Sequence, residues 1–228
     1  MQTVIESSFP RSVIGAPLRR ASAPGRGQML RRSIDVLLAG LALLFFAPVM
    51  AAVALMVWLQ DGGSALYAHT RIGRDGRTFK CLKFRSMLMD SDARLHKLLA
   101  ESAEARVEWE RDHKLRNDPR ITPLGAFLRK SSLDELPQLF NVLTGEMSLV
   151  GPRPIVAGEV IRYGRRFSHY CSVRPGITGL WQVSGRNDVS YRRRVAIDTC
   201  YAQKNSLLLD LRIMLMTVPS VLMRKGSY

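Results

Sequence analysis

The stretch from Val36 to Leu59 reads VLLAGLALLFFAPVMAAVALMVWL and contains no charged residue. About 20 such residues are enough for a helix to cross the hydrocarbon core of a bilayer, so a membrane-embedded helix is expected here. The run begins too far into the chain, and is too long, for a secretory signal peptide. The fold is therefore expected to be built around one apolar helix near the amino terminus.

Two features bear on how this helix lies in the membrane. Basic residues flank it on both sides, with Arg31 and Arg32 before it and a second basic cluster after it. The positive-inside rule places basic flanks on one side of the membrane, which a single span does not allow. Pro48 removes the hydrogen bond to the Leu44 carbonyl and favours a kink. From the residues alone two forms stay open: a re-entrant helix over about residues 33–60 that bends at Pro48, and a straight span.

The chain is strongly basic, with 34 Lys and Arg against 19 Asp and Glu and a formal net charge of +15. Three partners suit this charge: nucleic acid, an anionic membrane surface and a phosphate-rich substrate. Residues 1–28, rich in Pro, Gly, Ser and Arg, are expected to form a flexible basic tail. Residues 29–228 are expected to form the remaining domain, with a cytoplasmic part over about 61–228. Three cysteines without a CxxC pair, and scattered histidines, predict neither a disulfide framework nor a zinc site.

The part after the apolar run is expected to be α+β and mostly helical. Asp75-Gly76 predicts the turn of a short β-hairpin whose second strand is Thr78–Phe84. Residues 90–115 are expected to form one charged amphipathic helix. The apolar segment 207–223, interrupted by two charges and a proline, is expected to lie in the membrane interface as an amphipathic helix. An ordinary core helix is the alternative for this last segment.

Asp134-Glu135 is the only pair of adjacent acids in the chain. Two helices are expected within 122–143, and Ser132-Leu-Asp-Glu135 fits the capping box of the second one. Pro137 conflicts with that register, so this helix either begins later or has an irregular first turn. In both cases the acids lie at a helix N-terminus, where negative charge is stabilised. A carboxylate there can attack phosphorus or hold Mg²⁺, and the alternative is two capping acids without chemistry.

Arginines occur in the glycine- and proline-rich loops after this pair and at a helix junction just before it. A guanidinium binds phosphate oxygens in pairs, and a site for a diphosphate and a lipid phosphate needs several fixed cations. Spacing alone does not show that these arginines converge, and each one is also consistent with a surface charge. The candidates are Arg129, Arg153 in GPRP, Arg174 in RPGITG and Arg186 in SGRND.

The runs SSLDELPQLFNVLTGEMSLVGPRP and RPGITGLWQVSGRND closely resemble the bacterial sugar transferase family, the monotopic phosphoglycosyl transferases. The proline-centred apolar segment and the run FKCLKFRSM resemble that family too, so the likeness covers about residues 29–226. The chain looks like a small stand-alone member. The resemblance implies a helix-break-helix that re-enters the inner membrane of a bacterial cell, with the active site facing the cytoplasm. One departure is Ala47, where the family often has serine before the proline.

The resemblance also implies a reaction. Asp134 attacks the β-phosphate of a UDP-sugar, releases UMP and forms a covalent phosphosugar-aspartate, which polyprenyl (undecaprenyl) phosphate then attacks. Mg²⁺ is the implied cofactor, held partly by Asp134, and Glu135 is implied to assist binding or proton handling. The four loop and junction arginines become candidates for phosphate and nucleotide contact, with Lys83 and Arg85 as weaker ones. The expected product begins an exopolysaccharide or glycoconjugate, and the sugar is expected to be a hexose.

The expected partners are the UDP-sugar, the polyprenyl phosphate, anionic membrane lipids and a second copy in a homodimer. No nucleic acid is expected, because no RRM, KH or helix-turn-helix pattern occurs. Three other interpretations stay open. The chain could be a basic membrane-tethered module without catalysis, a family member that acts only as a scaffold, or a direct-displacement transferase in which Asp134 is a metal ligand or base.

Overall fold

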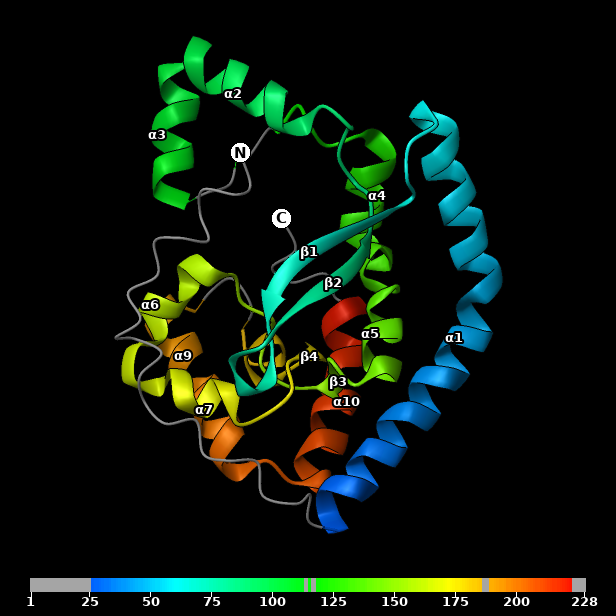
Figure 1. Ribbon diagram of the computed structural model, residues 1–228, viewed down its shortest axis with the longest axis vertical. Helices are drawn as coiled ribbons and strands as arrows, with labels where there is room; N and C mark the ends of the chain where they lie inside the picture. The colour runs from blue at the N-terminus through cyan, green and yellow to red at the C-terminus, as the bar shows by residue number, and fades with distance from the viewer. Residues whose placement is uncertain (1–25, 113–114, 116–117, 186–188, 223–228) are drawn as a thin grey trace.

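The computed structural model describes residues 26–112, 115, 118–185 and 189–222. Helices predominate and two small two-stranded sheets accompany them, so the mostly helical α+β class is confirmed (Figure 1). The helices are α1 (Arg26–Asp61), α2 (Ser91–Glu101), α3 (Ala103–Asp112), α4 (Pro123–Ser131), α5 (Gln138–Thr144), α6 (Val160–Tyr163), α7 (Phe167–Cys171), α8 (Leu180–Val183), α9 (Tyr191–Lys204) and α10 (Leu207–Leu222). The strands are β1 (Leu66–Ile72), β2 (Thr78–Phe84), β3 (Ser148–Val150) and β4 (Gly176–Thr178), and four short 3₁₀ turns lie between them: η1 (Arg74–Gly76), η2 (Leu133–Glu135), η3 (Ala157–Glu159) and η4 (Gly164–Arg166).

α1 is one uninterrupted helix that contains Pro48. It runs as an arc along one side of the protein (Figure 1), and its start at Arg26 lies inside the segment expected to be a flexible tail. The helix break expected at Pro48 is not seen. A proline removes one backbone hydrogen bond, and the Ala, Leu and Met residues around it favour the helix. Whether the helix re-enters the membrane or spans it is a separate matter, and the re-entrant topology stays a prediction. Residues 1–25, the rest of the expected tail, lie outside the described residues.

One face of α1 packs against the rest of the protein along nearly its whole length. Near its start, Arg31 donates hydrogen bonds to Asn205, and its Nε lies 3.7 Å from an oxygen of Asp210 on α10. In its middle, Ala39 is fully buried against β2 and α5. In its last third, Val57 is buried with residues of β2 and α4. The opposite face exposes large apolar side chains: Leu37, Leu41, Leu44, Phe45, Leu55, Trp58 and Leu59.

β1 and β2 form the expected antiparallel hairpin. The turn residues Asp75 and Gly76 have φ values of 59° and 71°, a left-handed conformation that glycine and aspartate tolerate. Because side chains alternate along a strand, Cys81 and Lys83 share one face of the hairpin. Cys81 is buried on that face, so Lys83 is directed toward the interior of the protein.

The segment around the acid pair contains two helices, as expected, and Pro123 opens the first. The expected capping box of Ser132 and Glu135 is wrong. Ser132 instead ends α4 in the left-handed conformation, with φ of 59°, and its side chain caps neither η2 nor α5. Pro137 delays α5 until Gln138, because proline cannot supply the N–H that the earlier register requires. The acids therefore lie in the tight turn η2, immediately before α5.

Two other helix predictions meet different outcomes. The single helix expected over 90–115 is wrong, because Ser102 has an extended backbone and separates α2 from α3. α10 has two faces: Ile213 is fully buried, while Leu208 and Leu215 are exposed. The helix thus contributes to the core and also presents an apolar surface.

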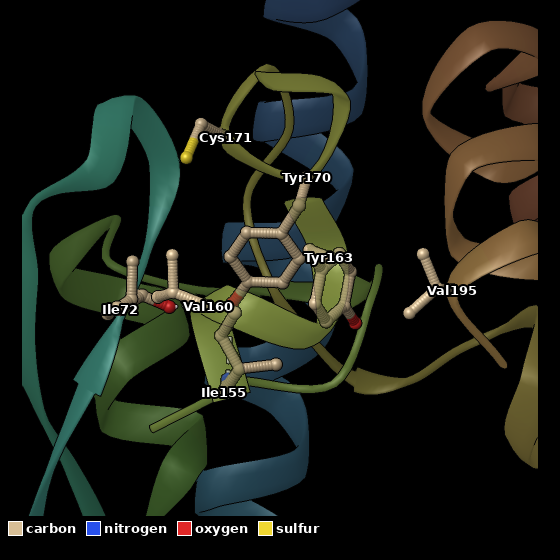
Figure 2. Packing of buried hydrophobic residues seen from close by; sticks show 7 residues of the cluster. All are labelled: Ile72, Ile155, Val160, Tyr163, Tyr170, Cys171 and Val195. Atoms are coloured by element: carbon tan, nitrogen blue, oxygen red, sulfur yellow. Dashed lines mark hydrogen bonds between the residues drawn. The ribbon is translucent and has the colours of Figure 1, made fainter. Parts of the chain in front are cut away.

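A core of aromatic and aliphatic side chains anchors the loop that follows β3. Figure 2 shows Tyr170 in the middle of this cluster, beside Tyr163. The Tyr170 hydroxyl donates to the Ile72 carbonyl at 2.6 Å and accepts from the Ile155 amide at 3.3 Å. The Ile72 amide in turn donates to the Ile155 carbonyl at 2.9 Å. These bonds hold the end of β1 against the loop that carries Arg153.

Candidate active site

The acid pair lies where the end of β2 meets the turn η2. Asp134 is buried, and Glu135 is half-buried. The ammonium of Lys83 lies 2.6 Å from Glu135 Oε1 and 3.7 Å from Asp134 Oδ2. Lys83 therefore pairs more closely with Glu135 than with Asp134.

The pKa values of the two carboxyl groups are shifted in opposite directions. Burial raises the pKa of Asp134, and the Glu135 carboxylate raises it further, against the opposing charges of Lys83, Arg129 and Arg153. Burial also raises the pKa of Glu135, but the Lys83 and Arg153 charges and hydrogen bonds from Lys83 and Gln138 outweigh it, so the net shift is downward. Neighbouring carboxyls whose pKa values are pushed apart are typical of sites in which the two groups have different chemical roles.

Two of the arginines expected from the sequence act on this pair. Arg129 donates from Nε to the Ser86 hydroxyl at 2.8 Å. Burial lowers the pKa of Arg129, and the nearby Asp134 charge opposes that effect. The positive charge of Arg153 acts on both carboxyls. It opposes the rise in the pKa of Asp134 and adds to the fall in the pKa of Glu135. Together with Lys83, these groups place three cations around two carboxylates, which leaves positive charge for an anionic substrate.

A small cavity of about 20 Å³ lies beside Glu135. Asp134 is not among its lining residues. Arg71 and Gln182 line it although neither was expected from the sequence. The complete lining is Arg71, Cys81, Lys83, Glu135, Gln138, Arg153, Pro154, Gly176, Ile177 and Gln182.

A buried asparagine sets the position of Lys83 relative to the acids. Asn141, on α5, is only 2% exposed. Its Oδ1 accepts from the Leu82 amide at 2.9 Å, and its Nδ2 donates to the Lys80 carbonyl at 2.8 Å. These bonds to the backbone of β2 join the strand that carries Lys83 to the helix that follows Asp134.

Two other candidates that the structure describes, Arg174 and Arg85, do not meet at this pair. Arg174 donates from Nε to the Gly145 carbonyl at 2.8 Å, at the far end of α5. Arg85 forms a two-pronged ion pair with Asp61 at the end of α1 and donates to the Ser64 carbonyl. Arg186 lies outside the described residues. The roles of Arg174 and Arg85 in phosphate binding stay predictions, and their contacts show a structural use for each.

One signal in the sequence pointed to the importance of Lys83. In TFKCLKF the apolar or small residues Phe79 and Cys81 follow the polar Thr78 and Lys80, and period-2 alternation puts Lys83 on the same face as Phe79 and Cys81. A lysine on the buried face of a strand calls for a partner anion. Asn141 and Gln182 gave no comparable signal, because their contacts come from segments far away in the chain.

The residues present are compatible with Mg²⁺. Within the described ranges, no group of three or more His, Cys, Asp and Glu side chains could hold a metal ion. Mg²⁺ does not require such a cage, because it commonly binds through one or two carboxylates, substrate phosphates and water. Asp134 and Glu135 supply two carboxylates of the right chemistry. The site is thus suited to a metal that binds together with a diphosphate.

The site thus combines a long apolar helix, an acid pair of which Asp134 is buried, and an excess of nearby cations. Comparison with known proteins assigns the family: the bacterial sugar transferase pattern matches residues 26–224. The chain belongs to the bacterial sugar transferase family.

Three relatives illustrate the range of this likeness. The exopolysaccharide production protein ExoY of Rhizobium meliloti is 52% identical over 202 residues, which are 89% of each chain. The undecaprenyl-phosphate galactose phosphotransferase of Salmonella typhimurium is 48% identical over 96% of this chain and 46% of its own length. The UDP-glucose:undecaprenyl-phosphate glucose-1-phosphate transferase of Escherichia coli is 37% identical over 93% of this chain and 44% of its own. The chain thus spans less than half the length of the last two relatives.

Proposed function

We propose that this protein is a phosphoglycosyl transferase that moves a hexose 1-phosphate from a UDP-hexose to undecaprenyl phosphate and releases UMP. The observation that carries the proposal is the buried Asp134 beside a Lys83–Glu135 ion pair, with Arg129 and Arg153 acting on the same carboxyl. The names of the relatives support the substrates, since they specify undecaprenyl phosphate and galactose or glucose. The reaction would supply the lipid-linked sugar that starts an exopolysaccharide.

The reaction proceeds in two displacements at one site. A carboxylate oxygen of Asp134 attacks the β-phosphorus of the UDP-sugar, and the bond to the α-phosphate oxygen breaks, so that UMP leaves. The sugar phosphate stays on Asp134 as an acyl phosphate. A phosphate oxygen of undecaprenyl phosphate then attacks the same phosphorus, and the Asp134 carboxylate leaves. Nucleophilic catalysis of this kind divides one transfer into two easier steps.

The surrounding side chains have separate tasks in these steps. Lys83, Arg129 and Arg153 bind phosphate oxygens and stabilise the charge that develops on them. Glu135, whose pKa is lowered, remains ionised and holds Lys83 in place. Asp134, whose pKa is raised, is the more basic carboxylate and therefore the better nucleophile once it is ionised. Mg²⁺ held by Asp134 and Glu135 would neutralise part of the diphosphate charge.

The packing of α1 favours a shallow position in the membrane. The protein packs against α1 from Arg31, near its start, to Asp61 at its end, through polar contacts as well as apolar ones. A helix that crossed the bilayer upright would draw Lys83 and the acid pair into hydrocarbon, at a large energetic cost. We therefore place α1 in the cytoplasmic leaflet of the inner membrane, with both ends and the active site toward the cytoplasm. Its exposed apolar face then contacts the lipid.

A product assay tests the proposed function. The full chain in detergent, with Mg²⁺ and undecaprenyl phosphate, is given UDP-galactose, UDP-glucose or UDP-N-acetylglucosamine in turn, and both UMP and the lipid product are measured. The proposal predicts equal amounts of UMP and undecaprenyl-diphosphate hexose with one UDP-hexose. UMP formation without a lipid product would indicate hydrolysis instead of transfer. Absence of both products with every donor would support the non-catalytic interpretations.

A further inference from the structure

A second and much larger cavity lies at the carboxyl end of α5. Its volume is about 770 Å³. The first turns of α1, the β1–β2 turn and the segment after α5 surround it. We call it the α5 end cavity, and its lining is Gln28, Met29, Arg32, Ser33, Gly73, Arg74, Asp75, Arg77, Thr78, Phe79, Thr144, Gly145, Glu146 and Arg174. α5 has seven residues and is about 10 Å long, and this lining includes neither acid of the pair and shares no residue with the small cavity beside Glu135.

Basic side chains outnumber acidic ones in this cavity. Its lining has four arginines, against Asp75 and Glu146. Glu146 already accepts hydrogen bonds from the Asn141 amide and the Thr144 hydroxyl. The Asp75 carboxylate lies 3.8 Å from Arg74 Nε, beyond hydrogen-bond distance. The two acids therefore do not balance the arginines.

The arginines also repel one another. Burial lowers the pKa of Arg174, and the charges of Arg74 and Arg32 lower it further, while Asp35 and Asp75 oppose the shift. Arg32 and Arg174 are partly satisfied, because they donate to the carbonyls of Val142, Leu143 and Gly145 at the end of α5. Like charges held together in this way create a positive potential that an anion would relieve.

One nitrogen of the Arg74 guanidinium lacks a hydrogen-bond acceptor within the described part of the chain. Its Nε is buried and has no hydrogen-bond partner among the residues that the structure describes, since Asp75 Oδ2 at 3.8 Å is too far for one. The turn that carries it is fixed by a 2.7 Å bond from the Gly73 amide to the Arg77 carbonyl, and it packs on α7. A buried donor without a partner is costly, so its persistence in a rigid turn calls for an explanation such as a bound acceptor.

We propose that the α5 end cavity is an anion site for a phosphate group, separate from the acid pair, and that Arg74 and Arg77 are its principal donors. The location favours the headgroup phosphate of an anionic lipid as the source. Met29 lines the cavity, and the exposed apolar residues Leu30 and Leu37 follow it along α1, so acyl chains could lie beside the helix. The site would hold the first turns of α1 at the membrane surface.

Native mass spectrometry of the full chain in detergent tests the proposal, with phosphatidylglycerol as the probe and phosphatidylcholine of the same chains as the neutral comparison. Wild type is expected to retain phosphatidylglycerol selectively. Arg74→Gln combined with Arg77→Gln is expected to weaken retention about tenfold or more. The matched control is Arg165→Gln with Arg166→Gln, two exposed arginines outside the cavity, which should not change it. Thr78→Asp adds a negative charge at an exposed lining residue and should also weaken retention. This variant replaces the double variant in the test if the double variant does not fold.

A second arm separates the two sources of phosphate. Inorganic phosphate is added at low salt, and the unfolding temperature is measured for wild type and the two double variants. Lipid retention without a phosphate-dependent shift identifies a lipid headgroup site. A shift that Arg74→Gln with Arg77→Gln removes, without selective lipid retention, identifies a site for soluble phosphate. The proposal is overturned if wild type binds neither probe, or if the cavity variants bind like the control.

Discussion

Basic side chains lie at both ends of α5 and make different kinds of contact there. At the amino end, Lys83 faces two carboxylates and lies close to only one of them. At the carboxyl end, Arg32 and Arg174 donate to backbone carbonyls in the last turn of the helix and just after it, where intrahelical donors run out. The comparison teaches that a charged side chain bound to the backbone supports the fold. A charge that faces a buried, incompletely paired carboxylate is available for chemistry.

The largest expected effect comes from removing the proposed nucleophile. Asp134→Ala should reduce sugar-phosphate transfer by at least about 10³-fold, because a covalent intermediate cannot form. UMP release in the presence of undecaprenyl phosphate measures this loss. The protein should remain folded and monodisperse, since the substitution removes a buried charge. Transfer that falls only a fewfold would demote Asp134 to a supporting role.

The amino end of α5 also predicts a sharp difference between two lysines of β2. Lys83→Met should lower transfer by about 100-fold, because it removes a charged hydrogen bond to Glu135 and a cation beside Asp134. Lys80→Met is the matched control, since Lys80 is exposed and its ammonium donates to the Thr70 hydroxyl, away from the acid pair. The ratio of kcat/KM between the variants is the measurement. Equal losses in the two variants would remove the special place of Lys83.

The carboxyl end predicts a loss of stability without a loss of chemistry. Arg32→Met removes the side-chain donor of the Leu143 carbonyl and one of two donors of the Val142 carbonyl, which keeps its bond from the Gly145 amide. The free energy of unfolding should fall by about 1–3 kcal/mol, which a thermal unfolding scan in detergent detects as a lower midpoint. Transfer per folded molecule should stay near the wild-type rate. A normal midpoint with a lost rate would instead connect this end of α5 to catalysis.

The smallest expected effects distinguish the two acids by pH. The pKa of Asp134 in the folded protein is raised above its ordinary value of 3.8. The free energy of unfolding therefore falls as the pH rises from 3.8 through the raised pKa, because the buried carboxyl then ionises. Asp134→Asn should therefore raise the unfolding midpoint at pH 7, and the gain should shrink as the pH falls and the wild-type carboxyl becomes protonated.

Glu135 should behave in the opposite way. Its pKa is lowered below 4.5, so its contribution to stability is complete above pH 4.5 and is lost as pH falls through the lowered value. Glu135→Gln should lower the midpoint at pH 7. If Asp134→Asn and Glu135→Gln shift the unfolding midpoint in the same direction at pH 7, the opposite pKa shifts of the two carboxyls are contradicted.

Local patterns predicted the local parts of this fold. Asp75-Gly76 predicted the hairpin turn, and Pro123 predicted the start of α4, because each depends on the backbone of a few neighbouring residues. The capping box failed for the same local reason, since Pro137 prevents α5 from starting earlier. The acid pair was found from its sequence alone, together with its place before a helix.

The surroundings of that pair depend on distances that no local pattern contains. Lys83 and Glu135 are 52 positions apart, and Asn141 joins its helix to β2 across 59 positions. Arg174 has the same glycine-proline context as Arg153, yet it binds the far end of α5. Convergence in space is therefore the part of the site that required the structure.

The central claim is that Asp134 carries the sugar phosphate covalently, and intact-protein mass tests it most directly. Purified protein is incubated with Mg²⁺ and a UDP-hexose, without undecaprenyl phosphate, and its mass is measured at short times. The account predicts an added hexose phosphate on wild type, its absence in Asp134→Ala, and its loss from wild type when undecaprenyl phosphate is added. Wild type that forms lipid product while never showing the adduct, even at the earliest times, would contradict it and favour direct displacement.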